Sequence, residues 1–83
     1  MASVILHDAH GQALPVGSQV RRVSRSNAVV GYDGIAWLEN LSDVNPLEVI
    51  APDGKRCKAT LTVGANPEHK LQTYGPLVCR EGP

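Results

Sequence analysis

The feature that most constrains this chain is the alternation of apolar and polar residues in short runs between turn residues. The alternation is clearest from 55 to 63, where the apolar positions are Cys57, Ala59, Leu61 and Val63. A period of two predicts a β-strand with one face toward a core. About seven such runs, broken by turn residues roughly every 8–12 positions, indicate an all-β fold, a small antiparallel Greek-key β-sandwich of about seven strands.

The stretch from Ala28 to Leu41 carries the strongest turn signal. Asp33-Gly34 stands between two β-rich runs, and this dipeptide is typical of a tight hairpin turn because Gly accepts a positive φ. We therefore predict that the runs on either side pair as a hairpin. After the turn, Ala36 and Leu38 share one strand face, and Ile35 and Trp37 share the other.

The same alternation recurs at 47–50, where Leu47 and Val49 point one way and Ile50 the other. If the first set faces the core, Ile35, Trp37 and Ile50 point outward on two adjacent strands. Trp is favoured at the centre of protein interfaces, so we predict a binding face at these three residues. The alternative left open by the sequence is that they cover a second layer or a loop of the domain itself.

Three other segments carry local expectations. We expect Val16, Ser18 and Val20 to share a buried face, with a bulge at Arg21-Arg22 that returns Val23 to the core. We expect 40–46 to be a connection between strands. The last strand is expected over 73–80, with Pro76 marking an edge.

The 83 residues fit one small domain, 1–83, with few aromatic side chains and no Phe. A core this thin needs a covalent staple. Cys57 and Cys79 both fall on inward sets, and closing the loop of about 23 residues between them would contribute roughly 3 kcal/mol. An even cysteine count in a tiny domain favours an oxidising compartment, while two reduced buried thiols in a cytosolic protein are the alternative.

The charge balance argues against a nucleic-acid partner, and it leaves the role of one arginine cluster open. Lys plus Arg number eight, as do Asp plus Glu, which lacks the basic excess typical of nucleic-acid binding. We therefore expect no nucleic-acid partner. Arg21, Arg22 and Arg25 are interpreted as a solvated edge that deters strand addition, with a second contact patch as the alternative.

No catalytic constellation stands out. His7 and His10 are three residues apart across a turn, which does not match metal-ligand spacing, so we expect a surface turn there. The serines lack a nucleophile motif and the glycines form no phosphate loop. We predict no enzyme activity, no cofactor and no metal. No run reaches the ~20 apolar residues of a membrane span, so we expect no membrane insertion by this domain. Without a secretory signal ahead of the first strand, an exported location implies a piece of a longer chain.

The ordered motifs resemble the C-terminal domain of outer-membrane fimbrial ushers, the assembly platforms of chaperone–usher pili. The family's Gly-x-x-Leu-Pro-Phe-Gly-Ala run is similar to 11–18, and its Gly-Ile-Val-Gly-Asp-Asp-Gly-Gln-Val-Tyr-Leu segment is similar to 28–38. Cys57 and Cys79 match a cysteine near a strand and a final cysteine. The departures are Val16 for Phe, Ser18 for Ala, Tyr32 for Asp and Ile35 for Gln. An apolar Ile35 where the family is polar favours the outward assignment.

The resemblance implies a periplasmic domain of an outer-membrane protein, attached after a transmembrane β-barrel. Its expected function is a non-enzymatic binding platform that engages periplasmic chaperone–subunit complexes during pilus assembly and secretion. Other domains of the parent usher are expected as further partners, and no cofactor is implied. The alternative is a secreted carbohydrate-binding or adhesin β-sandwich module with Tyr32 and Trp37 as a sugar platform.

Overall fold

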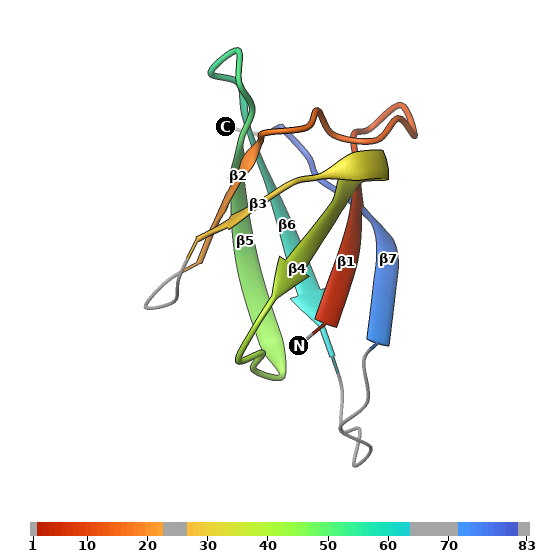
Figure 1. Cartoon of the computed structure of the whole chain (residues 1–83), viewed down its shortest axis with the longest axis vertical. Helices are drawn as coiled ribbons and strands as arrows, with labels where there is room; N and C mark the ends of the chain where they lie inside the picture. The colour runs from red at the N-terminus through yellow and green to blue at the C-terminus, as the bar shows by residue number, and fades with distance from the viewer. Residues whose placement is uncertain (1, 23–26, 64–71, 82–83) are drawn as a thin grey trace.

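A computed structural model describes residues 2–22, 27–63 and 72–81. In this described part of the chain, seven strands and one short 3-10 turn form two facing sheets (Figure 1). The elements are β1 (Ala2–His7), β2 (Gln19–Arg21), β3 (Ala28–Val29), η1 (Tyr32–Gly34), β4 (Ile35–Leu38), β5 (Val44–Ile50), β6 (Arg56–Thr62) and β7 (Gln72–Val78). The all-β fold class is confirmed.

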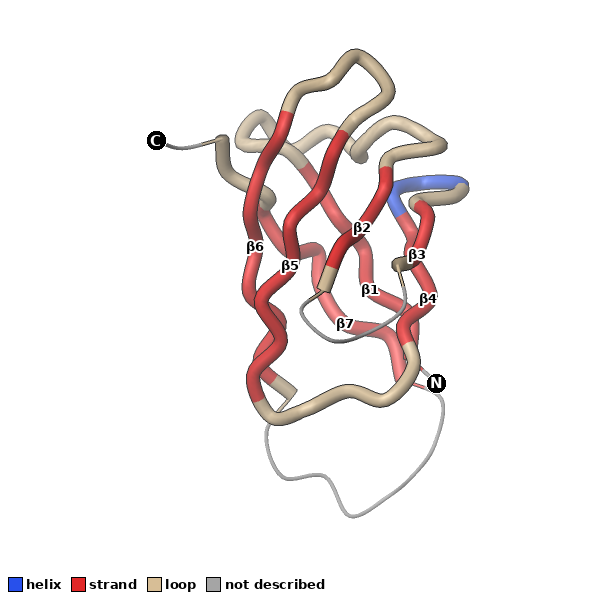
Figure 2. The backbone as a smooth tube through the Cα atoms, turned by 90° about the vertical axis from the view of Figure 1, so that its left-hand side faces the viewer, coloured by secondary structure: helices blue, strands red, loops and turns tan. Residues whose placement is uncertain are grey.

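The strands divide into a three-stranded sheet, β4-β1-β7, and a four-stranded sheet, β3-β2-β5-β6. Figure 2 shows β2, β5 and β6 in front of β1 and β7, so that the sheets form two layers. All pairs are antiparallel except β1 with β7, which run parallel. Because β7 has a neighbour on one side only, the prediction that Pro76 marks an edge strand is confirmed.

The core fills the space between the sheets and follows the predicted alternation. Ala36 and Leu38 from β4 are buried, as are Leu47 and Val49 from β5. From β6, Ala59 and Leu61 are buried, and the partly buried Cys57 packs against them. The inner faces of seven short strands thus supply a core of aliphatic side chains.

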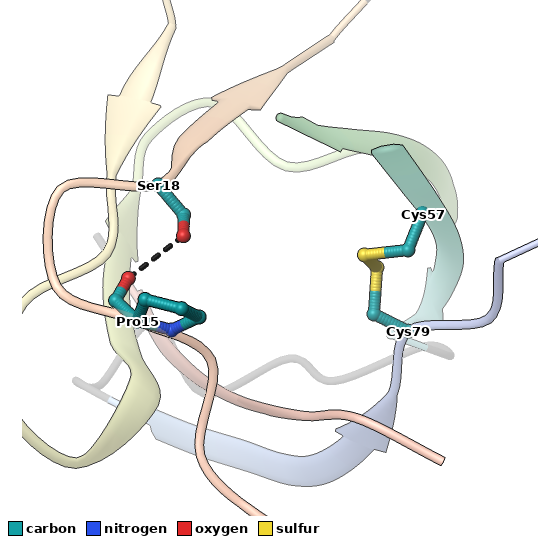
Figure 3. The surroundings of a disulfide bond; sticks show 4 residues. All are labelled: Pro15, Ser18, Cys57 and Cys79. Carbon is teal, nitrogen blue, oxygen red and sulfur yellow. Dashed lines mark hydrogen bonds between the residues drawn. A yellow bond between two sulfur atoms is a disulfide. The ribbon is translucent and has the colours of Figure 1, made fainter. Parts of the chain in front are cut away.

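A disulfide between Cys57 and Cys79 closes one side of the sandwich, as Figure 3 shows. Cys57 lies on β6 and Cys79 directly follows β7, so the bond joins the two sheets. Beside it, the backbones of Lys58 and Arg80 exchange two hydrogen bonds of 2.9 Å. On the other side of the same view, Ser18 Oγ donates a hydrogen bond of 2.7 Å to the Pro15 carbonyl. The predicted staple is confirmed.

The Asp33-Gly34 turn does not make a hairpin, and that prediction is wrong. β3 pairs with β2 and β4 pairs with β1, so the turn carries the chain from one sheet to the other. Its local chemistry is as expected, with φ of 55° at Asp33 and 75° at Gly34. A side chain at Gly34 would meet the Leu6 carbonyl oxygen on β1. The turn therefore packs directly against β1, which brings β4 beside that strand.

Two other local predictions are corrected. Val16 is exposed, unlike Ser18 and Val20, because it sits in a turn that precedes β2. The predicted connection at 40–46 ends early, since β5 begins at Val44. Pro46 is tolerated inside β5 because β2 pairs only with 48–50 of that strand. The expected bulge toward Val23 lies outside the described residues.

Candidate functional site

The outer surface of the three-stranded sheet is largely apolar. We call it the apolar face and define it by Ile5, Ile35, Trp37, Pro76 and Val78. Trp37 is 54% exposed and Val78 40% exposed, which is high for side chains of their size. Their strands β4 and β7 flank β1. An exposed apolar patch of this kind, when contiguous, marks a surface for another protein or a ligand.

Strand register brings the members of the apolar face together. Ile35 on β4 lies directly opposite Ile5 on β1. On the other side of Ile5, the ladder with β7 is interrupted at Gly75-Pro76. Gly75 has a φ of +104°, and an added Cβ there would lie 2.6 Å from the Ile5 carbonyl oxygen. This close approach is possible because glycine has no side chain, and it brings β7 tightly against β1 under the apolar face.

The row next to the isoleucines is anchored by a polar pair. Trp37 lies opposite Ser3, and Ser3 lies opposite Thr73. Ser3 Oγ donates a hydrogen bond of 3.0 Å to Thr73 Oγ1. Ser3 is only 5% exposed although it belongs to the outward set of β1. Ser3 is thus hydrogen-bonded within the sheet, while Trp37 and Thr73 are the exposed side chains of this row.

The structure separates the three residues predicted as one binding face. Ile35 and Trp37 lie on the outer surface of the three-stranded sheet, whereas Ile50 lies on β5 in the four-stranded sheet. The predicted adjacency of their strands is wrong, because it depended on the hairpin reading of the turn and on the order of elements along the chain. The outer surfaces of two packed sheets point away from each other. The sequence-based prediction did not assign Ile5, Pro76 and Val78 to this surface. The alternation of Ile5 with Val4 and Leu6 would have placed Ile5 on the outward face of its strand.

The outer surface of the four-stranded sheet carries a group of charged side chains, and Val29 and Val44 are exposed on the same sheet. We call it the charged face and define it by Arg21, Glu48, Arg56 and Lys58. Arg21 on β2 lies opposite Glu48 on β5, which lies opposite Lys58 on β6. Glu48 Oε1 is 4.0 Å from Arg21 Nη1, and its Oε2 is 3.9 Å from Arg56 Nη1. Three cations therefore surround one carboxylate.

The interpretation of the arginines as an edge is wrong for Arg21. Its strand β2 lies between β3 and β5, so it is an inner strand of the four-stranded sheet. Arg22 Nη1 donates a hydrogen bond of 2.8 Å to the Glu39 carbonyl, which follows β4. This contact joins the ends of strands from different sheets. Arg25 lies outside the described residues.

The segment that follows β1 forms the expected surface turn. Asp8 Oδ1 accepts hydrogen bonds from the backbone N–H groups of His10, at 2.8 Å, and Gln12, at 3.0 Å. The hydrogen bond from Gln12 is the largest cause that lowers the pKa of the Asp8 carboxyl, because it favours the charged form. Among the described residues, no group of three His, Cys, Asp or Glu side chains is placed to hold a metal ion. Nor does any helix in these residues have the length and apolarity to cross a membrane.

Comparison with known proteins identifies the family. The model of the PapC C-terminal domain matches residues 4–65. The crystal structure of the C-terminal domain of the PapC usher superposes with a TM-score of 0.74 at 27% identity, covering 95% of this chain and 96% of that one. The Caf1A usher C-terminal domain, described for conserved hydrophobic clusters on its surface that are important for F1 antigen assembly, superposes with a TM-score of 0.76 at 15% identity, covering 94% and 96%. A comparison with curated protein sequences gave no match.

The all-β sandwich with its single disulfide is of the class of usher C-terminal domains, which have a role in the chaperone–usher pilus system. The chain belongs to the PapC C-terminal domain family, whose model covers most of its length. The predicted resemblance to fimbrial ushers is confirmed. Family membership favours this assignment over the alternative of a secreted carbohydrate-binding or adhesin module.

Proposed function

We propose that this domain is a periplasmic binding platform of an outer-membrane usher, and that its apolar face engages chaperone–subunit complexes during pilus assembly. The observation that carries the proposal is the exposure of Trp37 on the edge strand β4, next to the paired Ile35 and Ile5 on the outer surface of the sheet. The fold alone does not require a half-exposed Trp, because the core is complete without it. The related Caf1A domain, whose surface hydrophobic clusters are important for assembly of its antigen, supports the proposal.

The chemistry of the apolar face suits a reversible contact. Trp37 and the two isoleucines supply apolar area, while Ser3 donates a hydrogen bond to Thr73 and the exposed Thr73 hydroxyl adds a polar group beside them. Burial of apolar surface contributes about 25 cal/mol per Å², so a contact of a few hundred Å² yields moderate affinity. A site that passes its cargo on needs this kind of strength. Of the three residues predicted as the site, the proposal keeps Ile35 and Trp37 and leaves out Ile50.

The experiment is an NMR titration of the ¹⁵N-labelled domain with a purified chaperone–subunit complex from the same pilus system. We expect shifts at Ile5, Ile35 and Trp37, and at least a tenfold loss of affinity in Trp37→Ala, since interface Trp residues often contribute 2 kcal/mol or more. Val44→Ala is the matched control. Val44 is 55% exposed, almost the same as Trp37, but it lies on β5 in the opposite sheet.

Two outcomes would contradict the proposal. If the shifts fall only on the four-stranded sheet, the binding surface has been assigned to the wrong side of the domain. If Trp37→Ala and Val44→Ala lose affinity equally, the effect is general and not centred on the apolar face. Spectra of both variants in the absence of partner establish that each is folded.

A further inference from the structure

We propose that the charged face is a second docking surface, which takes an extended acidic segment of a partner protein. Arg21, Glu48 and Lys58 form one row across β2, β5 and β6, and Arg56 lies beside it. The whole chain has equal numbers of acidic and basic residues, so this local excess of positive charge is concentrated on one surface. Charge complementarity of this kind governs the specificity and the rate of association.

The cations of the charged face can form further hydrogen bonds and ion pairs. The two guanidinium–carboxylate separations of 4.0 and 3.9 Å exceed hydrogen-bond distance, so Glu48 does not saturate the donors of Arg21 or Arg56. Lys58 makes no ion pair with any residue that the structure describes. Both arginine side chains are more than half exposed. An incoming carboxylate can therefore form bidentate hydrogen bonds with a guanidinium while Glu48 stays in place.

A shallow groove runs beside the row. It has a volume of about 350 Å³ and is lined by Arg21, Arg22, Pro46, Leu47, Glu48 and Lys58. The exposed Pro46 gives it an apolar part between basic side chains, whereas the Leu47 side chain is buried in the core. This combination fits a segment that carries acidic and apolar side chains in turn. A flat anionic surface could not enter the groove and would not contact its apolar part.

The distance between the cations and their small number favour a protein segment over a membrane. Adjacent strands lie about 4.8 Å apart, so Arg21 and Lys58, two strands apart, stand roughly 10 Å from each other. A polyproline-type chain rises about 3.1 Å per residue with three residues per turn, so every third side chain repeats on one side at about 9 Å. Binding to anionic lipid takes clusters of roughly four to eight cations at about 1 kcal/mol each. The charged face offers three, or four with the exposed Arg80 that pairs with Lys58, and Glu48 among them lowers the net charge to at most three.

The test uses a fluorescein-labelled peptide with the repeat Glu-Pro-Val, three times over, and the same peptide with Gln in place of Glu. We expect the Glu peptide to bind with shifts at Arg21, Glu48 and Lys58, and to weaken at least tenfold in R21E/K58E. The matched comparison is K58E alone against K55E, which changes net charge equally at an exposed position outside the groove, and K58E is expected to weaken binding more. Arg80 is not used, because its backbone pairs with Lys58. If R21E/K58E does not fold, R21Q/K58Q replaces it, and K58Q is compared with K55Q.

Four results would overturn this inference: no binding of the Glu peptide at millimolar concentration, equal binding of the Gln peptide, equal losses in K58E and K55E, or binding to phosphatidylglycerol vesicles without binding to the peptide. The inference is independent of the apolar face. Trp37→Ala is expected to bind the Glu peptide as the unsubstituted chain does, so failure here and failure of the proposed function are distinguishable.

Discussion

The two outer faces of the sandwich differ although both are built on strands of the same kind. The apolar face exposes Trp37 and Val78, and of its hydrogen-bonded Ser3–Thr73 pair only Ser3 is buried. The charged face exposes arginines and a lysine around Glu48. Since the inner faces of both sheets are aliphatic, folding does not explain the difference. Under the two proposals above, the two surfaces meet partners of different chemistry.

The largest expected effect tests what holds the faces in a fixed relation. The disulfide joins β6, which carries part of the charged face, to the end of β7, which borders the apolar face. Cys57→Ala with Cys79→Ala should destabilise the domain by about 3 kcal/mol in the chain-entropy model, given a sequence separation of 22. Urea denaturation followed by Trp37 fluorescence measures the loss. A loss below about 1 kcal/mol would show that packing alone fixes the two sheets.

The two faces are also unequal in how much of each the sequence predicts. Alternation correctly assigns Ala36 and Leu38, or Leu47 and Val49, to the core, because side-chain direction follows from the local backbone. Strand pairing is not local. Asp33-Gly34 has the chemistry of a hairpin turn, yet the chain leaves it for the other sheet, since β4 finds its partner in β1.

That single misreading explains the error at Ile50. With the turn read as a hairpin and β4 taken as the neighbour of β5, Ile50 joined Trp37 on one face. With the observed pairing, it lies on the surface of the charged sheet, opposite Gln19 and Arg56. The charged face takes Arg21 from β2, Glu48 from β5 and two residues from β6, and β3 and β4 separate β2 from β5 along the chain. No contiguous motif reveals it, and only the register brings its members together.

A pair of glycine substitutions sharpens the comparison. Gly75 underlies the apolar face with a φ of +104°, and Gly54 sits in the turn between β5 and β6 of the charged sheet with a φ of +90°. Ala at Gly54 meets nothing within 4 Å, so it should cost about 1 kcal/mol from backbone strain alone. Ala at Gly75 adds overlap with Ile5 and should cost about 1–2 kcal/mol more.

The readout is thermal unfolding of both variants, followed by titration with the chaperone–subunit complex. Gly75→Ala is expected to weaken this binding, because β7 must move away from β1 and carry Pro76 and Val78 with it. Gly54→Ala should leave binding unchanged. Equal stability and equal binding in the two variants would mean that the close approach at Ile5 does not shape the apolar face.

The smallest expected effect concerns the turn that leads from β1 of the apolar sheet toward β2 of the charged one. The pKa of Asp8 lies below its usual value of 3.8 in the folded chain, chiefly because the carboxylate accepts the Gln12 N–H. A folded-state pKa below the unfolded one means that Asp8 stabilises the fold above pH 3.8, and that this contribution is lost as pH falls through the folded value. Asp8→Asn should therefore lower the unfolding midpoint slightly at neutral pH. The difference in midpoint between the variant and the unsubstituted chain should shrink steadily as the pH falls below 3.8. Thermal unfolding from pH 7 down to pH 2 measures it. A difference that stays constant with pH would assign the effect to turn geometry and not to the charge of Asp8.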